Sequence, residues 1–284
     1  MKHPTDASAK RLNVPCGRCG ACRATRRNDW TFRLAQEAKD HIHTQFITLT
    51  YRDEDLPIVD NPSGPAPSLV REDFTLFLKR LRKQQTKYTN KKIRYYAVGE
   101  YGTETARPHY HIIAFSIHPR NTHNIDQIWP FGHFHHVPLE PALIHYITKH
   151  HVNTKDNNVY HGEHHEPEFS TQSRMPGIGH AYIEKNKQWH IDNKHFHVLF
   201  NGRKQRLPRY YRDKIFSKHE QRLHAVKIQS QQSEDYAREY ERLKRLNIKY
   251  PDQNYADDFD QYMSESKFID SKKIIDKAKE GNFF

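Results

Sequence analysis

Apolar and polar residues alternate in three stretches of the first half of the chain, and each stretch predicts a β-strand. These stretches are FITLTY (46–51), IRYYAVGEY (93–101) and HYHIIAFSI (109–117), all rich in β-branched and aromatic residues. Only the turn-rich segment YGTETARP separates the last two, so they predict an antiparallel hairpin. A second hairpin is predicted in HFHVLFNGRKQRLP, where Asn201 and Gly202 form the expected turn.

Apolar residues at helical spacing predict three helices around these strands. Residues 23–40 place Trp30 and Leu34 on one face of the first. The second has Ser68 as its expected cap and ends in the basic run KRLRKQQTK, and the third begins at Pro141. The apolar face of the second helix consists of Phe74, Phe77, Leu78 and Leu81, and that of the third of Leu143, Ile144 and Ile147.

The remaining segments predict loops and a helical extension. Residues 52–67, 118–138 and 153–180 are polar or rich in Pro and Gly, which favours loops. From about residue 217 the chain is charged and helix-prone, with no strand pattern. Antiparallel strands that carry helices predict the α+β fold class.

Composition adds a class of partner to this picture. The chain has 284 residues, of which 35% are hydrophobic, a net charge of +12 and an isoelectric point near 9.4. Such a basic excess favours a polyanion such as nucleic acid, although a merely soluble basic surface has the same composition. No apolar run reaches the roughly 20 residues of a membrane span, and the start MKHPTDASAK has no apolar core of a signal peptide. We therefore expect no membrane partner and a cytosolic location.

Two histidines and one carboxylate on the first hairpin predict a metal site. His109 and His111 are two residues apart on a strand, so their side chains share a face. Glu100 ends the preceding strand and should lie beside them. Two imidazoles, one carboxylate and open positions suit Mn²⁺ or Mg²⁺ acting on phosphate oxygens. The same H-x-H spacing recurs at 133–135 and 195–197, and a half-buried strand with histidines on its wet face is the alternative.

A tyrosine and a lysine on the third predicted helix add a nucleophile. Tyr146 and Lys149 are three residues apart, which places them on one helix face. A phenol can attack phosphorus once it loses its proton, and the product is a covalent phosphotyrosine. A nearby cation such as Lys149 would favour the phenolate. The chain has 16 tyrosines, most of which are expected only to pack, so Tyr146 depends on the predicted metal site for this role.

These motifs resemble the HUH endonucleases, which initiate rolling-circle replication. FITLTY, GEYG with RPHYHIIAF, and YITK are similar to their three motifs in the correct order. The similarity is greater still to the replication initiators of gokushovirus-type microviruses, which are single-stranded DNA phages. There it includes VPCGRCGAC, WPFG, EFSTQSRMPGIG and LPRYYRDKIF, and so extends over residues 14–216.

The resemblance implies a fold, an activity and a set of site residues. It implies a five-stranded antiparallel sheet flanked by helices, and nicking of single-stranded DNA at a replication origin with rejoining later. By position, Glu100, His109 and His111 match the metal ligands, Tyr146 the nucleophile and Lys149 the motif lysine. We see one tyrosine on that helix where some phage initiators have two, so rejoining would use a second subunit or Tyr146 again.

The resemblance also divides the chain and suggests partners. We expect a disordered tail (1–13), an HUH endonuclease domain with an N-terminal Cys-rich turn (14–216) and a charged helical extension (217–284). No Walker A motif is present, so a host helicase and polymerase are expected partners in the host cytoplasm. A relaxase or transposase nickase uses the same residues, and a non-catalytic, zinc-stabilised nucleic-acid-binding protein is the alternative from another class.

Three cysteines near the start suggest a second metal. Cys16, Cys19 and Cys22 have C-x₂-C-x₂-C spacing, which suits a structural zinc ion with a fourth ligand that the sequence does not identify. An iron–sulfur cluster or three reduced thiols are the alternatives. The basic segments RATRR, KRLRKQQTK and NGRKQRLPRYYRDK combine cations with aromatic rings, a composition typical of single-strand binding.

Overall fold

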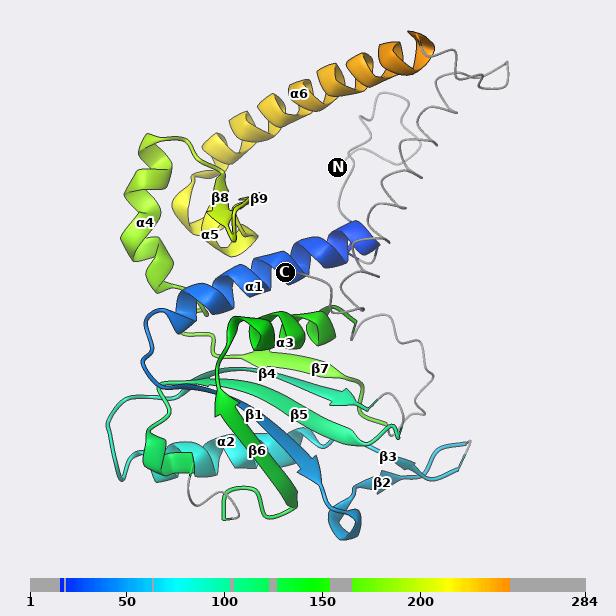
Figure 1. Ribbon diagram of the computed structural model, residues 1–284, viewed down its shortest axis with the longest axis vertical. Helices are drawn as coiled ribbons and strands as arrows, with labels where there is room; N and C mark the ends of the chain where they lie inside the picture. Colours follow the sequence, from blue (N-terminus) through cyan, green and yellow to red (C-terminus); the bar gives the residue numbers. More distant parts are fainter. Residues whose placement is uncertain are drawn as a thin grey trace.

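A five-stranded antiparallel sheet forms the centre of the computed structural model (Figure 1). The structure describes residues 16–17, 19–62, 64–102, 105–122, 127–153 and 165–245. The strand order is β6 (Gly132–Pro138), β1 (Thr44–Tyr51), β5 (Pro108–Phe115), β4 (Arg94–Tyr101) and β7 (Phe169–Gln172). The predicted α+β class with a five-stranded antiparallel sheet is therefore confirmed.

The alternation along each strand sends side chains to two different layers. On β5, Tyr110 and Ile112 point to one face, where they join a core cluster with α2 (Arg71–Gln85). Ile113 and Phe115 point to the other face, which α1 (Gly20–Ala38) and α3 (Pro141–Asn153) cover. Figure 1 shows α2 on one side of the sheet and α1 with α3 on the other.

The predicted apolar faces of these helices are the buried ones. On α2, Phe74, Phe77, Leu78 and Leu81 are all buried against the sheet. On α3, Ile144 and Ile147 are buried and Leu143 packs against the same cluster. Periodicity of 3.6 residues was therefore sufficient to identify the inward face.

A buried carboxylate fixes α1 at its C-terminal end. Glu37 accepts hydrogen bonds from the Arg94 side chain on β4, from the Gly179 backbone N–H (2.7 Å) and from the His41 ring (3.2 Å). Burial would raise the pKa of Glu37, but these bonds outweigh it and lower the pKa to about 2. A buried charge with several partners specifies one docking of helix and sheet, because any slip would leave it unpaired.

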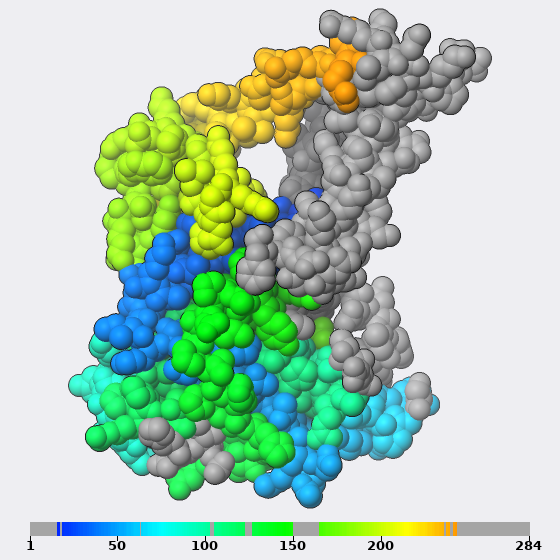
Figure 2. Space-filling view, viewed as in Figure 1, coloured from blue at the N-terminus to red at the C-terminus, as the bar shows by residue number. Residues whose placement is uncertain are grey.

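The C-terminal part stacks on the outer side of α1, away from the sheet. It comprises α4 (Ala181–Asp192), the hairpin of β8 (His197–Phe200) and β9 (Arg203–Arg206), α5 (Arg209–Ile215) and α6 (Lys218–Arg245). Phe32 of α1 is buried against Tyr211 and Val198 there. Figure 2 shows this part and α6 at the end of the molecule remote from the sheet. The predicted hairpin turn is confirmed, with Asn201 and Gly202 at φ of 49° and 71°.

Short elements complete the described fold. They are η1 (Asp53–Asp55), β2 (Ile58–Val59), β3 (Ala66–Pro67) and η2 (Pro119–Thr122). No helix among the described residues is both long and apolar enough to cross a membrane. The predicted disordered tail (1–13) lies outside the described residues, and so does the part of the predicted extension from residue 246 onward.

Three local predictions are wrong. Ser68 does not cap α2, since Val70 holds the cap position and the Ser68 hydroxyl bonds Leu69 and Glu166 backbone groups instead. The predicted loop 118–138 contains β6, and the predicted loop 153–180 contains β7. Both are edge strands, and backbone pairing with β1 or β4 replaces the apolar pattern that their sequences lack.

Candidate active site

The two central strands bring the predicted metal ligands together. In the register of β4 and β5, Glu100 lies directly opposite His109, and His111 follows two residues later on the same face. The Glu100 oxygen Oε1 is 3.0 Å from Nε2 of His109 and 3.0 Å from Nε2 of His111. One ligand atom from each of the three residues lies within 4.8 Å of the others. Glu100 and His111 are buried, and His109 is half-buried.

Neighbouring groups orient the two imidazoles. The Nδ1 of His109 is 3.0 Å from the Arg107 carbonyl, which can only accept a hydrogen bond, so this nitrogen carries a proton. The Nδ1 of His111 is 3.0 Å from the hydroxyl of Thr48 on β1. These contacts leave Nε2 of both rings directed at the carboxylate. Outer-sphere hydrogen bonds of this kind commonly hold metal-binding histidines in place.

This arrangement calls for a positive charge between the three groups. A neutral His109 with its proton on Nδ1 would turn the lone pair of Nε2 toward a carboxylate oxygen, which is repulsive. Burial lowers the pKa of His109, but the hydrogen bond and charge of Glu100 outweigh it and raise the pKa. A proton can satisfy the site, and so can a divalent cation. Two nitrogens and one carboxylate fit Mn²⁺ or Mg²⁺ with positions left for substrate oxygens.

The predicted nucleophile lies against the same histidine. The Tyr146 hydroxyl on α3 is 3.2 Å from Nε2 of His111, and the two rings meet edge to face at 5.1 Å. The Tyr146 side chain also packs on Phe46 of β1, yet the residue is 41% exposed, so a large substrate can reach it. Burial and the charge of Glu100 raise the pKa of Tyr146 to about 12. The phenol therefore needs added positive charge before it can ionise near neutral pH.

Lys149 lies one helical turn beyond Tyr146 on α3 and is half-buried. At this position it adds a cation on the side of α3 that follows the tyrosine. The predicted group of Glu100, His109, His111 and Tyr146 is thus gathered in one place, with Lys149 on the adjacent turn.

Sequence reasoning did not identify two further features of the site. Thr48 orients His111, and the alternating threonines of FITLTY were the available signal. The register of β6 also places His133 opposite Thr50 and His135 opposite Thr48, on the same sheet face as the ligands. These exposed histidines lie one strand beyond β1 and were set aside as unrelated to the site.

The third H-x-H pair belongs to a different part of the molecule. His197 begins β8, and His195 packs beside it and Trp189 of α4. Neither belongs to a cluster of three possible metal ligands among the described residues. Leaving this pair out of the site is consistent with its position.

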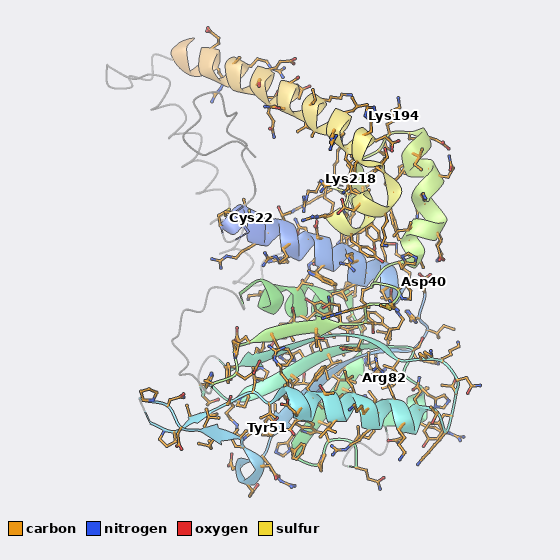
Figure 3. The ribbon with its side chains drawn as sticks, turned by 180° about the vertical axis from the view of Figure 1, so that it is seen from behind. Cys22, Asp40, Tyr51, Arg82, Lys194 and Lys218 are labelled. Carbon is orange, nitrogen blue, oxygen red and sulfur yellow. The ribbon has the colours of Figure 1, made fainter. Side chains whose placement is uncertain are left out.

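The three cysteines converge at the start of α1. Their sulfurs lie within 4.8 Å of one another, and those of Cys16 and Cys22 are 3.9 Å apart. The Cys19 backbone N–H donates to the Cys16 sulfur at 3.2 Å. Tetrahedral zinc–thiolate geometry sets sulfur–sulfur distances of about 3.8 Å, so the turn is close to a metal-binding arrangement. Figure 3 shows Cys22 at the end of α1 opposite Asp40.

Comparison with known proteins identifies relatives by sequence. Residues 44–155, which contain all five catalytic candidates, match the family model of the replication-associated protein ORF2. The chain is 30% identical over 224 residues to "Replication-associated protein VP4" of Bdellovibrio phage phiMH2K, which is 70% of this chain and 66% of that protein.

Two further relatives match over shorter stretches. "Replication-associated protein ORF2" of Spiroplasma virus 4 is 42% identical over 106 residues, which is 37% of this chain and 32% of that protein. "Replication-associated protein ORF4" of Chlamydia phage 1 is 31% identical over 113 residues, 40% of this chain and 26% of that protein. The matched part of the chain thus spans less than two thirds of each relative. No solved structure matches.

Proposed function

The chain belongs to the family of replication-associated proteins of Spiroplasma, Bdellovibrio and Chlamydia phages, and on this premise we propose that it nicks single-stranded DNA at a replication origin. It is then an HUH endonuclease and strand transferase that starts rolling-circle replication and rejoins strands at its end. One observation carries the proposal: the Tyr146 hydroxyl lies 3.2 Å from a histidine that, with His109, shares the Glu100 carboxylate.

The proposed reaction is a transesterification. The Tyr146 oxygen attacks the scissile phosphorus, a new bond joins the phenolic oxygen to phosphorus, and the bond from phosphorus to the 3′ oxygen breaks. The phenol loses its proton, and the departing 3′ oxygen takes one up. The DNA is left as a 5′-phosphotyrosyl adduct and a free 3′ hydroxyl, and reversal of the same step rejoins the strands.

The side chains of the site have distinct roles in this proposal. Glu100, His109 and His111 hold a divalent cation, which when bound withdraws charge from the scissile phosphate. Thr48 and the Arg107 carbonyl keep both imidazoles turned toward that position. Phe46 and the ring of His111 fix the direction of the Tyr146 hydroxyl, and Lys149 adds positive charge near the phosphate.

The decisive experiment is adduct formation. Single-stranded oligonucleotides that tile the genome encoding the protein are incubated with it and Mn²⁺, and products are separated under denaturing conditions. We expect one oligonucleotide to leave its 3′ fragment attached to protein, with loss of the adduct in Tyr146→Phe and on chelation. An adduct that survives Tyr146→Phe would assign the nucleophile elsewhere. Metal-independent binding without any cleavage would favour the non-catalytic alternative.

We also propose that Cys16, Cys19 and Cys22 bind one structural zinc ion at the start of α1. The convergence of their sulfurs supports this, and the fourth ligand is not among the described residues that meet the same distance limit. Metal analysis of purified protein should find about one zinc per chain, reduced in Cys19→Ser. Iron with sulfide, or no metal, would contradict the zinc assignment.

Replication partners follow from the proposed chemistry. The free 3′ hydroxyl is a primer for a polymerase, and a separate helicase must unwind the duplex ahead of it. We propose that both come from the host and that the reaction takes place in the host cytoplasm. A pull-down from host extract in the presence of nicked origin DNA tests this, and recovery of neither activity would contradict it.

A further inference from the structure

A cleft between α1 and α5 unites two basic segments that lie far apart in the sequence. RATRR is in the first half of α1, and NGRKQRLPRYYRDK runs from β9 into α5. The cleft has a volume of about 300 Å³ and is lined by Arg26, Asp29, Trp30, Arg33, Pro208, Arg209, Tyr210 and Asp213. Figure 1 shows α5 on the side of α1 that faces away from α3.

The wall of the cleft is a rigid stack of flat groups. The Arg33 guanidinium lies between two aromatic rings, 4.2 Å from the centre of Trp30 and 4.1 Å from that of Tyr210. Its Nε donates to the Ile178 carbonyl at 3.1 Å. The Tyr210 ring packs so closely on Gly177 that a β-carbon there would lie 2.7 Å from the tyrosine oxygen. These contacts hold π-faces in place before any ligand binds.

The charges in the cleft favour an anion that also carries hydrogen-bond donors. Arg26 donates one nitrogen, Nη2, to the Gly17 carbonyl, while its Nη1 has no hydrogen-bond partner among the described residues. Asp29 is paired with Arg206 at 2.8 Å, and Asp213 with Arg209 at 3.2 Å. The two carboxylates are therefore largely neutralised, but each retains oxygens that can accept from a nucleobase amino group.

Flat π-surfaces, arginines and accepting carboxylates together suit one unpaired nucleotide. Its phosphate can pair with Arg26 or Arg209, and its base can stack on the ring and guanidinium planes. A base within a duplex is already stacked and cannot enter such a cleft. The cleft is of the size that small-ligand sites have, roughly 300 Å³ or more.

The cleft lies within reach of the proposed reaction centre. The Thr31 hydroxyl of α1 is 3.0 Å from that of Thr148, two residues after Tyr146 on α3. An α-helix with its side chains is about 10–12 Å across, so a strand that leaves Tyr146 has only α1 to cross. We propose that the α1–α5 cleft binds an unpaired nucleotide of the single strand whose scissile phosphate is presented to Tyr146. This inference rests on the proposed function and adds a second contact for its substrate.

The first test measures binding without cleavage. In a Tyr146→Phe background, anisotropy of a labelled single-stranded oligonucleotide of mixed sequence gives the Kd, with the same sequence as duplex for comparison. Arg209→Glu and the milder Arg209→Gln should raise the single-strand Kd about 5- to 100-fold. Arg222→Glu on α6 is the matched control, an exposed arginine with the same change in charge, and should leave the Kd nearly unchanged. An equal effect of Arg209→Glu and Arg222→Glu, or tighter duplex than single-strand binding, would overturn the proposal.

The second test does not depend on a variant. An oligonucleotide with iododeoxyuridine at successive positions is irradiated on the protein with wild-type cleft residues, and the crosslinked residue is found by mass spectrometry. We expect Trp30 or Tyr210 to be modified. Crosslinks only elsewhere would overturn the proposal. Crosslinks in the cleft without any Tyr146 adduct would retain the cleft and reject the nickase, and an adduct without cleft crosslinks would do the reverse.

Discussion

The two faces of the central sheet are built from alternate residues of the same strands, yet they differ in chemistry. Beneath α2 the face is apolar, with Leu49, Tyr110 and Ile112 packed on Phe77 and Leu81. Beneath α1 and α3 the same strands contribute an apolar cluster at one end and a polar group at the other. That polar group is Glu100, His109 and His111.

The difference shows how one sheet separates stability from chemistry. The face under α2 gains from every apolar side chain that it buries, and a buried side chain such as Phe or Leu contributes about 1.5–3 kcal/mol. The opposite face gives up part of that gain to hold a carboxylate almost out of water. Such a group is costly unless a positive partner accompanies it. Loss of a residue on the first face should therefore reduce folding, and loss of one on the second should reduce activity.

The largest effect is expected at Glu100. Glu100→Ala removes the carboxylate that both imidazoles face, and we expect adduct formation to fall about 1000-fold or more, equivalent to about 4 kcal/mol. His135→Ala is the matched control, because this histidine shares the sheet face and the H-x-H spacing but lies on edge strand β6. Its rate should stay within a few-fold of wild type. Equal losses in the two variants, measured as initial rates with Mn²⁺, would remove the distinction between the central and the edge strand.

On the α2 face the expected loss is in folding. Phe77→Ala opens a cavity against Trp129 and Phe134 and should cost about 3–5 kcal/mol of unfolding free energy in urea. Leu76→Ala, on the exposed side of the same helix, should cost less than 1 kcal/mol, roughly the range of surface substitutions. The Phe77→Ala protein that remains folded should still form the adduct. Loss of activity in fully folded protein would contradict the separation of the two faces.

Acid should weaken the helix-covered polar face first. The pKa of Glu37 lies at about 2 in the folded state, below the usual value near 4.5, so its contribution is complete above pH 4.5 and is lost as pH falls toward 2. Between pH 6 and pH 3 wild type should lose roughly 2 kcal/mol more than Glu37→Gln, in which this group no longer titrates. Urea midpoints at the two pH values measure the difference. Parallel losses in both proteins would mean that other carboxylates govern acid unfolding.

A smaller effect is expected from the hydroxyl behind His111. Thr48→Val keeps the shape of the side chain but removes the bond to Nδ1, and metal affinity and cleavage rate should fall about 10- to 100-fold. Thr50→Val, two residues along on the same face, is the matched control. Mn²⁺ titration of the cleavage rate distinguishes the two variants. If both behave like wild type, the Thr48 contact does not orient the ligand.

Much of this site could be predicted because its residues are close in the sequence. A strand alternates with a period of two residues, so His109 and His111 had to share a face, and a short hairpin had to return Glu100 to them. Helical periodicity likewise identified the buried side of α3 and hence the direction in which Tyr146 is exposed. In each case the geometry follows from a local repeat that tertiary contacts do not alter.

The failures concern segments whose structure depends on distant partners. HFHHVP in β6 has no apolar alternation, but pairing with β1 makes it a strand and brings His133 and His135 to the site face. Ser68 has the chemistry of a helix cap, but its hydroxyl is taken by the Glu166 backbone nearly a hundred residues away. No local pattern encodes these partners.

By itself, the sequence determined the sheet-and-helix class, the inward faces of α2 and α3, and the ligand set on the β4–β5 hairpin, because turns and side-chain periods are properties of short segments. Tertiary structure alone decided that Tyr146 meets His111 and that Thr48 stands behind it. It also brought Arg26 and Arg209 to one cleft across more than half the chain. These contacts require the packing of α1, α3 and α5 around the sheet, and that packing depends on side-chain fit between segments that are remote in sequence.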